Sequence, residues 1–280
     1  MISSAYNLET RSKAYFGSLL RRWRTVRHIS QLTLALDASI STRHLSCMET
    51  GRAQPSKEMV LRLGEALQIP LRERNTLLLA AGHSPHYRET SLEAPEMEEA
   101  CQAVNLFLEQ HEPYPVVVTD RYWNTLRMNS GMKNFFGRFP ICDSIRPHNG
   151  VRFVFHPKGL RPFIENWESV AARIIQRLHR EVASNPSDET MRSFLEELLS
   201  FPAVPSRWRA LNLNHSPPPF LTLNYKWGNS VLRFFAAATT FGTAQDVSLQ
   251  EMRIETFFPA DEATRAALIT AGQSEKATRN

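Results

Sequence analysis

Apolar residues recur at spacings of three and four along the N-terminal part of the chain, which is the pattern of short amphipathic helices. The first such segment, YFGSLLRRWRTVRH, spans residues 15–28. Ser30, Ser41 and Ser56 each precede a later segment, and their side-chain oxygens can cap a helix. A fifth segment closes the series. We therefore predict a compact all-α domain of five helices over residues 12–87.

The pattern changes after RETSLEAPE, a polar stretch with a proline that we expect to be a linker over residues 88–96. Beyond it, helical spacing gives way in places to β-branched or alternating segments that are typical of strands. Gly228-Asn229 fits a tight hairpin turn. The predicted strands lie in YPVVVTD, DRYWNTLRMN, FLTLNYKW, VLRFFAAATTF and EMRIETFF, and strong helices lie in NWESVAARIIQRLHREV and ETMRSFLEELLSF. We predict an α+β domain with an antiparallel sheet over residues 97–270.

Charge is unevenly distributed between the two predicted domains. Residues 1–90 hold 13 Lys and Arg against 7 Asp and Glu, whereas residues 91–280 hold 20 against 21. The basic surplus of the chain therefore lies in its first third. A positive field there favours a polyanion, and nucleic acid is the commonest one.

Other chemistry is not indicated by the sequence. The three cysteines are scattered without a Cys-x-x-Cys pair, so we expect neither a zinc site nor a disulfide framework. We find no Gly-rich phosphate loop and no hydrolase motif, and we expect no cofactor. No apolar run is long enough to cross a membrane and no signal core is present, so we expect a cytoplasmic protein.

Two helices separated by the four residues ASIS predict a helix-turn-helix. Over residues 15–82 the chain resembles the phage-repressor/Cro class, also called the Xre family. Ser39 stands where that family often has glycine, and a left-handed Ser39 would cost on the order of 1 kcal/mol. The matching residues are Ser30-Gln31, Leu34-Ala35, Ala38-Ser39-Ile40-Ser41, Leu45-Ser46 and Met48-Glu49-Thr50-Gly51.

The resemblance implies that the second helix of the motif lies in the DNA major groove, with its N-terminal residues on base edges. Arg43 is the best specificity candidate, because it can donate two hydrogen bonds to guanine, and the alternative is that it contacts only phosphate. Cys47 either contacts a base or only packs. The resemblance also implies a structural ion pair between Arg24 and Glu49. The implied base-reading residues are Thr42, Arg43, Ser46 and Cys47, and the implied phosphate contacts are Gln31, Arg52 and Lys57.

The remainder of the chain resembles the MmyB-like ligand-binding domain. The stretches that match are EQHEPYPVVVTDRYWNTLRMN, FHPKGLRPFIENWES and TTFGTAQDVSLQEMRIETFFPADE. This resemblance implies a PAS-like fold, with a five-stranded antiparallel sheet, helices on one side and a deep apolar pocket for a fatty-acyl-like ligand. The pocket candidates are Trp123, Phe135, Phe153, Trp167, Leu223, Tyr225 and Phe234, each of which can instead be ordinary core. The head-group candidates are His156, Arg161 and Asn166, which can instead satisfy buried backbone groups.

Three functions remain open at this point. The leading one is a DNA-binding transcriptional regulator, acting as a homodimer, whose second domain senses a small apolar ligand. A second makes that domain a dimerisation or partner-binding module only, and recovery of a bound lipid with the protein would distinguish the two. A third makes it an enzyme, but Asp120, His156 and Glu165 do not place an acid and a base beside a nucleophile. We therefore expect that the protein is not an enzyme.

Overall fold

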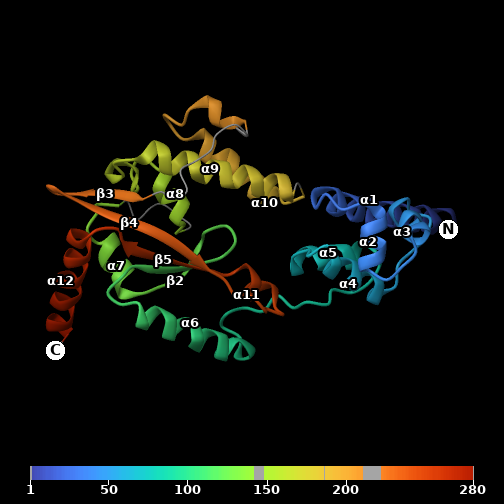
Figure 1. Cartoon of the computed structure of the whole chain (residues 1–280), viewed down its shortest axis with the longest axis horizontal. Coiled ribbons are helices and arrows are strands. Elements are labelled where there is room, and N and C mark those ends of the chain that lie inside the picture. The colour runs from blue at the N-terminus through green and yellow to red at the C-terminus, as the bar shows by residue number, and fades with distance from the viewer. Residues whose placement is uncertain (1, 142–147, 186, 211–221, 280) are drawn as a thin grey trace. The chain divides into compact units, whose positions relative to one another are not determined.

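The computed structural model describes residues 2–141, 148–185, 187–210 and 222–279, with side chains from residue 13 to residue 272 (Figure 1). The chain forms two compact units. Unit 1 consists of residues 1–94 and 242–250, and unit 2 consists of residues 95–241 and 251–280. The division after residue 94 falls inside the predicted linker. Residues 242–250, which the sequence assigned to the second domain, instead fold with the first.

The described part of unit 1 contains the five predicted helices followed by the added segment. The first helix is longer than predicted, because it begins at residue 2 rather than near residue 15. The predicted caps are confirmed, since Ser30, Ser41 and Ser56 each accept a hydrogen bond from a backbone N–H three residues later. The helices are α1 (Ile2–Val26), α2 (Gln31–Asp37), α3 (Thr42–Glu49), α4 (Lys57–Ala66) and α5 (Leu71–Ala80).

The turn between α2 and α3 has the geometry that the motif requires. Ser39 is left-handed with φ of 54°, so the strain expected for a residue other than glycine is present. Ala35 is buried between the helices, and Ile40 packs on the same core from the turn. At Gly17 of α1, a β-carbon would lie 2.5 Å from the carbonyl oxygen of Met48. Only glycine there lets α1 approach the end of α3.

Residues 242–250 are attached to unit 1 by hydrogen bonds from three places. The hydroxyl of Thr90 donates to Oδ2 of Asp246 over 2.6 Å, and the backbone N–H of Val247 donates to the carbonyl of Arg88 over 2.8 Å. The N–H of Leu71, at the first turn of α5, donates to Oε1 of Gln250 over 2.7 Å. The segment includes most of α11 (Val247–Glu251). A connection between two sheet strands therefore supplies a partner for the N-terminus of α5.

Unit 2 is built on a sheet of five antiparallel strands among its described residues, in the order β2-β1-β5-β4-β3. All the predicted strands are present, and the hairpin at Gly228 is confirmed by the pairing of Trp227 with Ser230. Phe220 and Leu221 of the predicted third strand lie outside the described residues. The strands are β1 (Val116–Thr119), β2 (Thr125–Met128), β3 (Leu223–Trp227), β4 (Ser230–Thr239) and β5 (Arg253–Pro259).

Helices cover both faces of this sheet, whereas the resemblance implied helices on one side. Arg127 of β2 pairs with Val118 of β1, and its guanidinium donates to Asn105 and to Cys101 of α6. Val117 lines the cavity between the sheet and helices α7 to α9, and Val118 points to the other face because successive strand residues alternate. Helix α6 lies on the opposite side of the sheet from α8 and α9 (Figure 1). The helices of unit 2 are α6 (Glu98–Gln110), α7 (Ser130–Phe136), α8 (Gly150–Phe155), α9 (Trp167–Ser184), α10 (Glu189–Ser200) and α12 (Glu262–Arg279).

Candidate functional site

Helix α3 presents its four base-reading candidates outward. Leu45 and Met48 are buried and anchor the helix in the core of unit 1. On the other side of α3, Arg43 is exposed and Thr42, Ser46 and Cys47 are half-buried. The cap at Ser41 fixes the start of the helix, so these side chains have defined positions on its first two turns. The arrangement fits a helix that inserts its N-terminal half into a groove.

Glu49 sits at the end of α3 and joins three helices. Its side chain is 2% exposed and accepts Nε of Arg24 at 2.6 Å and Nη2 of Arg24 at 3.0 Å. The predicted ion pair is therefore present in the structure. The side-chain amide of Gln31 also donates to Oε2 of Glu49 over 2.8 Å, a contact that the sequence analysis did not foresee. In this arrangement the Gln31 side chain links the start of α2 to the end of α3.

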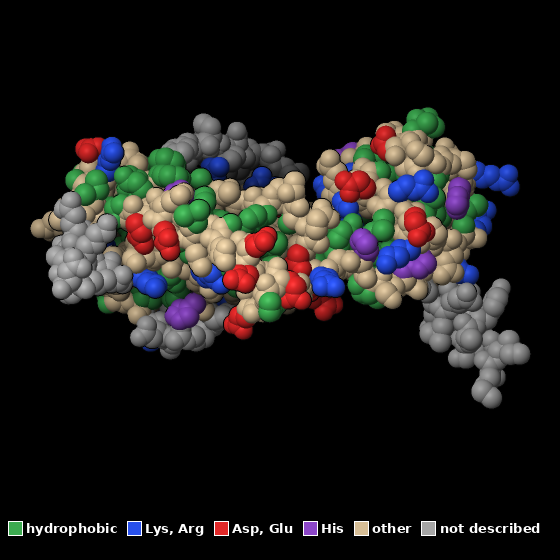
Figure 2. Space-filling view, turned by 90° about the horizontal axis from the view of Figure 1, so that it is seen from below, with side chains coloured by type: hydrophobic (Ala, Val, Ile, Leu, Met, Phe, Trp, Pro, Cys, Tyr) green, Lys and Arg blue, Asp and Glu red, His purple; other side chains and the backbone are tan. Residues whose placement is uncertain are grey.

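The two other phosphate candidates lie around α3 and α4. Arg52 is exposed and its Nε donates to the hydroxyl of Thr50 over 3.0 Å. Lys57 is half-buried at the first residue of α4. On the face of unit 1 that Figure 2 shows, Lys and Arg side chains are interspersed with Asp, Glu and His. The basic surplus thus does not form one continuous patch on that face.

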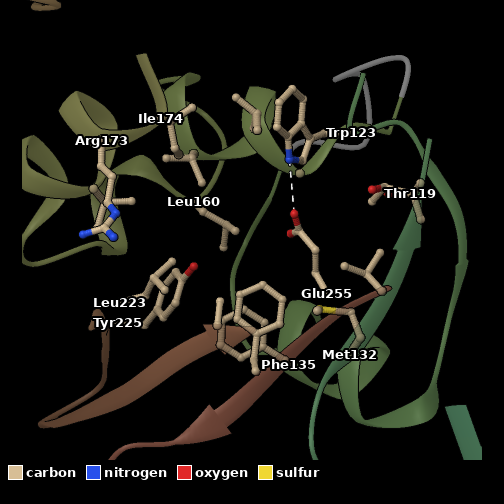
Figure 3. Close-up of a pocket in the computed structure, with 18 of the residues that line it drawn as sticks. Thr119, Trp123, Met132, Phe135, Leu160, Arg173, Ile174, Leu223, Tyr225 and Glu255 are labelled. Carbon is tan, nitrogen blue, oxygen red and sulfur yellow. Dashed lines mark hydrogen bonds between the residues drawn. The ribbon is translucent and has the colours of Figure 1, made fainter. Parts of the chain in front are cut away.

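Unit 2 contains a cavity of about 530 Å³ between the sheet and helices α7, α8 and α9 (Figure 3). Four predicted pocket residues line it, namely Trp123, Phe135, Leu223 and Tyr225. The rest of its apolar wall comes from both the sheet and the helices. These further apolar residues include Val117, Met132, Leu160, Val170, Ile174 and Phe257.

Three other pocket candidates do not line the cavity. Phe153 and Phe234 are buried in the surrounding core, where Phe234 packs edge-on against Phe135. Trp167 donates its indole N–H to the carbonyl of Val154 over 2.8 Å. Their assignment to the pocket was wrong because an apolar residue in this layer can point into the cavity or into the packing behind it.

The head-group candidates also lie outside the cavity lining, and the backbone-satisfying alternative holds for Asn166. Its Nδ2 donates to the carbonyl of Thr222 over 2.6 Å and its Oδ1 accepts the N–H of Asn224 at 3.1 Å. Arg161 donates to the carbonyl of Pro202 and stacks on an indole ring. The Nδ1 of His156 accepts the N–H two residues later. These side chains hold the β3 region and its surroundings in place.

The polar groups that do face the cavity were not foreseen from the sequence. Thr119 ends β1, and Glu255 lies in the middle of β5. Helix α9 contributes Arg173, Arg177 and Arg180, whose spacing of four and three places them on one face. The signals available in the sequence were that arginine spacing and the position of Glu255 between apolar residues of a predicted strand.

Glu255 is the electrostatic centre of this polar group. Its Oε1 accepts the indole N–H of Trp123 at 3.2 Å (Figure 3). Burial raises the pKa of the Glu255 carboxyl, while Arg177, Arg253 and the Trp123 hydrogen bond act in the opposite direction. Burial, followed by the charge of Glu255, raises the pKa of the Tyr225 hydroxyl, which therefore stays protonated at neutral pH.

A tight turn between β1 and β2 positions Trp123. The carboxylate of Asp120 accepts the backbone N–H groups of Tyr122 at 2.8 Å and Asn124 at 2.9 Å. Within this turn Trp123 is left-handed, with φ of 63°, a conformation that costs free energy for a bulky residue. The hydrogen bonds of Asp120 offset that cost and direct the indole toward Glu255.

The profile of the MmyB-like transcription regulator ligand binding domain matches residues 100–270. The chain belongs to the MmyB-like transcription regulator family. A helix-turn-helix domain profile matches residues 16–77 of this MmyB-like regulator. The two resemblances inferred from the sequence are thus confirmed, and the protein is a DNA-binding transcriptional regulator with a ligand-binding domain. No curated protein matches the chain.

Two solved structures are similar to parts of this MmyB-like regulator. The restriction-modification controller protein C.AhdI from Aeromonas hydrophila is 34% identical over 22% of this chain and 92% of its own, with a TM-score of 0.21. An RNA-binding light-oxygen-voltage receptor is 10% identical over 99% of this chain and 67% of its own, with a TM-score of 0.28. Both TM-scores are too low for these structures to carry an argument.

Within its described residues, the MmyB-like regulator has no helix with the length and apolar character needed to span a membrane. No group of three or more His, Cys, Asp or Glu side chains in the described part of the chain is placed to hold a metal ion. The surface of α3 and the cavity of unit 2 are the candidate functional sites of the regulator.

Proposed function

We propose that this regulator binds a specific DNA operator and that a small apolar, fatty-acyl-like ligand in the unit 2 cavity adjusts its affinity for that operator. The observation that carries the proposal is the cavity itself, about 530 Å³ in the domain that the family profile describes as ligand-binding. Cavities of roughly 300–1,000 Å³ hold small-molecule ligands. Mass spectrometry of the purified, denatured protein tests it, because an acyl compound should be recovered.

The lining supports an elongated apolar ligand. Met132, Phe135 and Leu160 form an apolar wall, and polar side chains are confined to a few positions (Figure 3). A site of this kind favours a molecule with a long hydrocarbon part and a small number of hydrogen-bonding groups. Recovery of the protein without any bound lipid, together with no binding of added acyl compounds, would leave the second domain as an assembly module.

Operator recognition is proposed to depend on Arg43. Arg43→Ala should weaken binding to the cognate site by about 1–3 kcal/mol and relax the preference for one base, because arginine pairs best with guanine. Lys57→Ala should instead weaken binding to all sequences similarly and reduce the salt dependence, because phosphate contacts carry no sequence information. Binding assays on operators with single base changes distinguish the two outcomes.

The informative result in this experiment is how the loss of affinity varies among the operator sequences, rather than how large the loss is. Both side chains lie at or near the surface, so neither substitution should unfold unit 1. If Arg43→Ala reduces affinity by the same factor for every operator variant, Arg43 contacts phosphate and the groove assignment is wrong.

The regulator is further proposed to act as a cytoplasmic homodimer. A single α3 reaches only a few base pairs, and two copies on half-sites about one helical turn apart would provide the specificity that one lacks. Sedimentation of the full chain with and without operator DNA measures this. We also propose that the protein has no catalytic role. The carboxylate of Asp120 accepts hydrogen bonds from Tyr122 and Asn124 within its own turn.

A further inference from the structure

Thr119 and Glu255 are neighbours on the cavity face of the sheet. Val117 pairs with Glu255, and Thr119 pairs with Arg253, so the side chains of all four residues lie on one face. Figure 3 shows the Thr119 and Glu255 side chains on the same side of the cavity, away from Arg173. The two therefore form one polar region at one end of an apolar space.

The hydroxyl of Thr119 is buried and has no hydrogen-bond partner among the described residues. The residue is 1% exposed, and its Oγ1 makes no hydrogen bond within the described part of the protein. Moving a hydroxyl from water into the protein interior without a new hydrogen bond destabilises the folded state. Because the side chain lines the cavity, a molecule bound there is the partner that would complete it.

Glu255 has acceptor capacity left after it binds the indole of Trp123. Of the two guanidinium groups that act on its charge, Arg177 and Arg253 each place one nitrogen near Oε1 of Glu181, at 3.1 Å and 3.4 Å. Nη1 of Arg253 makes no hydrogen bond within the described part of the protein. A ligand carboxylate at this point would face a second carboxylate. An uncharged N–H or O–H group would instead donate to Glu255 and accept from Thr119.

We propose that Thr119 and Glu255 form a head-group subsite for an uncharged amide or alcohol at the end of an alkyl chain. The subsite rests on the proposed function, because it requires that the cavity bind a ligand. The head group donates its hydrogen to the Glu255 carboxylate, and its oxygen accepts the Thr119 hydroxyl. The chain then extends along Met132 and Phe135, on the same wall of the cavity.

The test compares three ligands with the same alkyl chain on the full-length protein, by isothermal titration calorimetry at neutral pH. Decanamide has an uncharged donor, methyl decanoate is uncharged without a donor, and decanoate is anionic. Decanamide should bind about tenfold or more tightly than either of the others, because only decanamide can both donate to Glu255 and accept from Thr119.

Two substitutions at Thr119 separate the subsite from a structural role. Thr119→Val replaces the hydroxyl with a methyl group of similar size and should weaken decanamide and methyl decanoate by a similar factor, because the carbonyl oxygen of each accepts that hydroxyl. Thr119→Ser keeps the hydroxyl and should retain the affinity for both. Glu255→Gln should weaken decanamide about tenfold and methyl decanoate far less, because a neutral acceptor replaces a charged one. Melting temperatures establish that each variant is folded.

The results that would overturn the subsite differ from the result that would overturn the proposed function. Equal affinity for decanamide and methyl decanoate, tightest binding of decanoate, a preference for decanamide that survives Glu255→Gln, or unchanged affinities in Thr119→Val would overturn the subsite while leaving a ligand-binding cavity. If none of the three compounds binds, the proposal of an apolar acyl ligand fails as well.

Discussion

Glu49 is a buried carboxylate that three N–H groups hold at the junction of α1, α2 and α3. Glu49→Ala would leave the Arg24 guanidinium partly buried without its anion and would free Gln31. Breaking a buried pair in this way costs about 3–5 kcal/mol. We expect the free energy of unfolding of the DNA-binding unit to fall by that amount, as measured by chemical denaturation of the full chain.

Glu65 provides a matched control within the same unit. It also pairs with an arginine, Arg74, over 2.6 Å, but its own side chain is 77% exposed. Exposed ion pairs contribute at most about 1 kcal/mol, because solvent screens them and ordering the side chains costs entropy. Glu65→Ala should therefore have a small effect, and equal losses for the two variants would contradict the structural role given to Glu49.

Glu255 should make the stability of unit 2 depend on pH. Burial raises its pKa in the folded protein, against the opposing effects of Arg177 on α9 and Arg253 on its own strand. The folded state then holds this proton more tightly than the unfolded state, so stability is highest below the ordinary pKa of glutamic acid. It falls as pH rises through the interval up to the raised value.

Glu255→Gln cannot ionise and should remove this part of the pH dependence. The variant should gain melting temperature relative to the wild type as pH rises through that interval, with little difference at lower pH. Melting curves of both proteins across a pH series provide the measurement. A difference that stays constant at every pH would show that Glu255 does not titrate in that interval.

Some residue roles were visible in the sequence and others were not, for a physical reason. The caps at Ser30 and Ser41 and the pair of Arg24 with Glu49 depend on local spacing or on a motif, and both were predicted correctly. The sequence left two roles open for His156 and Asn166, because a motif does not show which way a side chain points. Thr119 and Glu255 were missed for the same reason, although strand alternation constrains both.

Long helices were easier to predict from the sequence than short ones. Helix α9 repeats its apolar face over several turns, whereas α7 and α8 are too short to display a helical period. Helix α12 was not foreseen, and its alanine-rich sequence has only a weak apolar stripe. Residues 242–250 fold with unit 1 although the ligand-binding profile includes them, because contacts distant in sequence decide their membership and no local pattern records them.

Asp246 is the residue that attaches this segment most firmly. Its carboxylate accepts the N–H and hydroxyl of Thr90 and the N–H of Ser248. Asp246→Ala should lower the free energy of local opening by about 1–3 kcal/mol, because hydrogen bonds to a charged acceptor are lost. Hydrogen exchange of the amides of residues 247–250 should then be faster by roughly 5–150-fold.

Gln245 is the natural control, since it is the exposed neighbour of Asp246. Gln245→Ala should leave the exchange rates unchanged. If Asp246→Ala also leaves them unchanged, the segment is held by Val247 and Gln250 alone, through their contacts with Arg88 and Leu71.

At the scale of the whole molecule, the chain itself links the cavity to the DNA-binding unit. Glu255 of the cavity lies on β5, and β5 follows directly on the segment that folds with unit 1. The beginning of this strand is fixed by Arg121, which binds both Glu251 and Asp188. We propose that a ligand that shifts β5 acts on this segment, which supplies the partner of the first turn of α5.

A ligand can change operator affinity only if it binds the DNA-competent and incompetent arrangements with different affinity. Coupling of this kind is about 1–3 kcal/mol, which corresponds to roughly 5–150-fold in operator affinity.

Leu223 lines the cavity, so Leu223→Gln should weaken ligand binding and the ligand response while leaving operator binding by the unliganded protein unchanged. Asp246→Ala should instead bind the ligand normally and lose the response. Operator titrations with and without decanamide measure both. If acyl compounds bind and operator affinity does not change, the second domain serves assembly and does not sense a ligand.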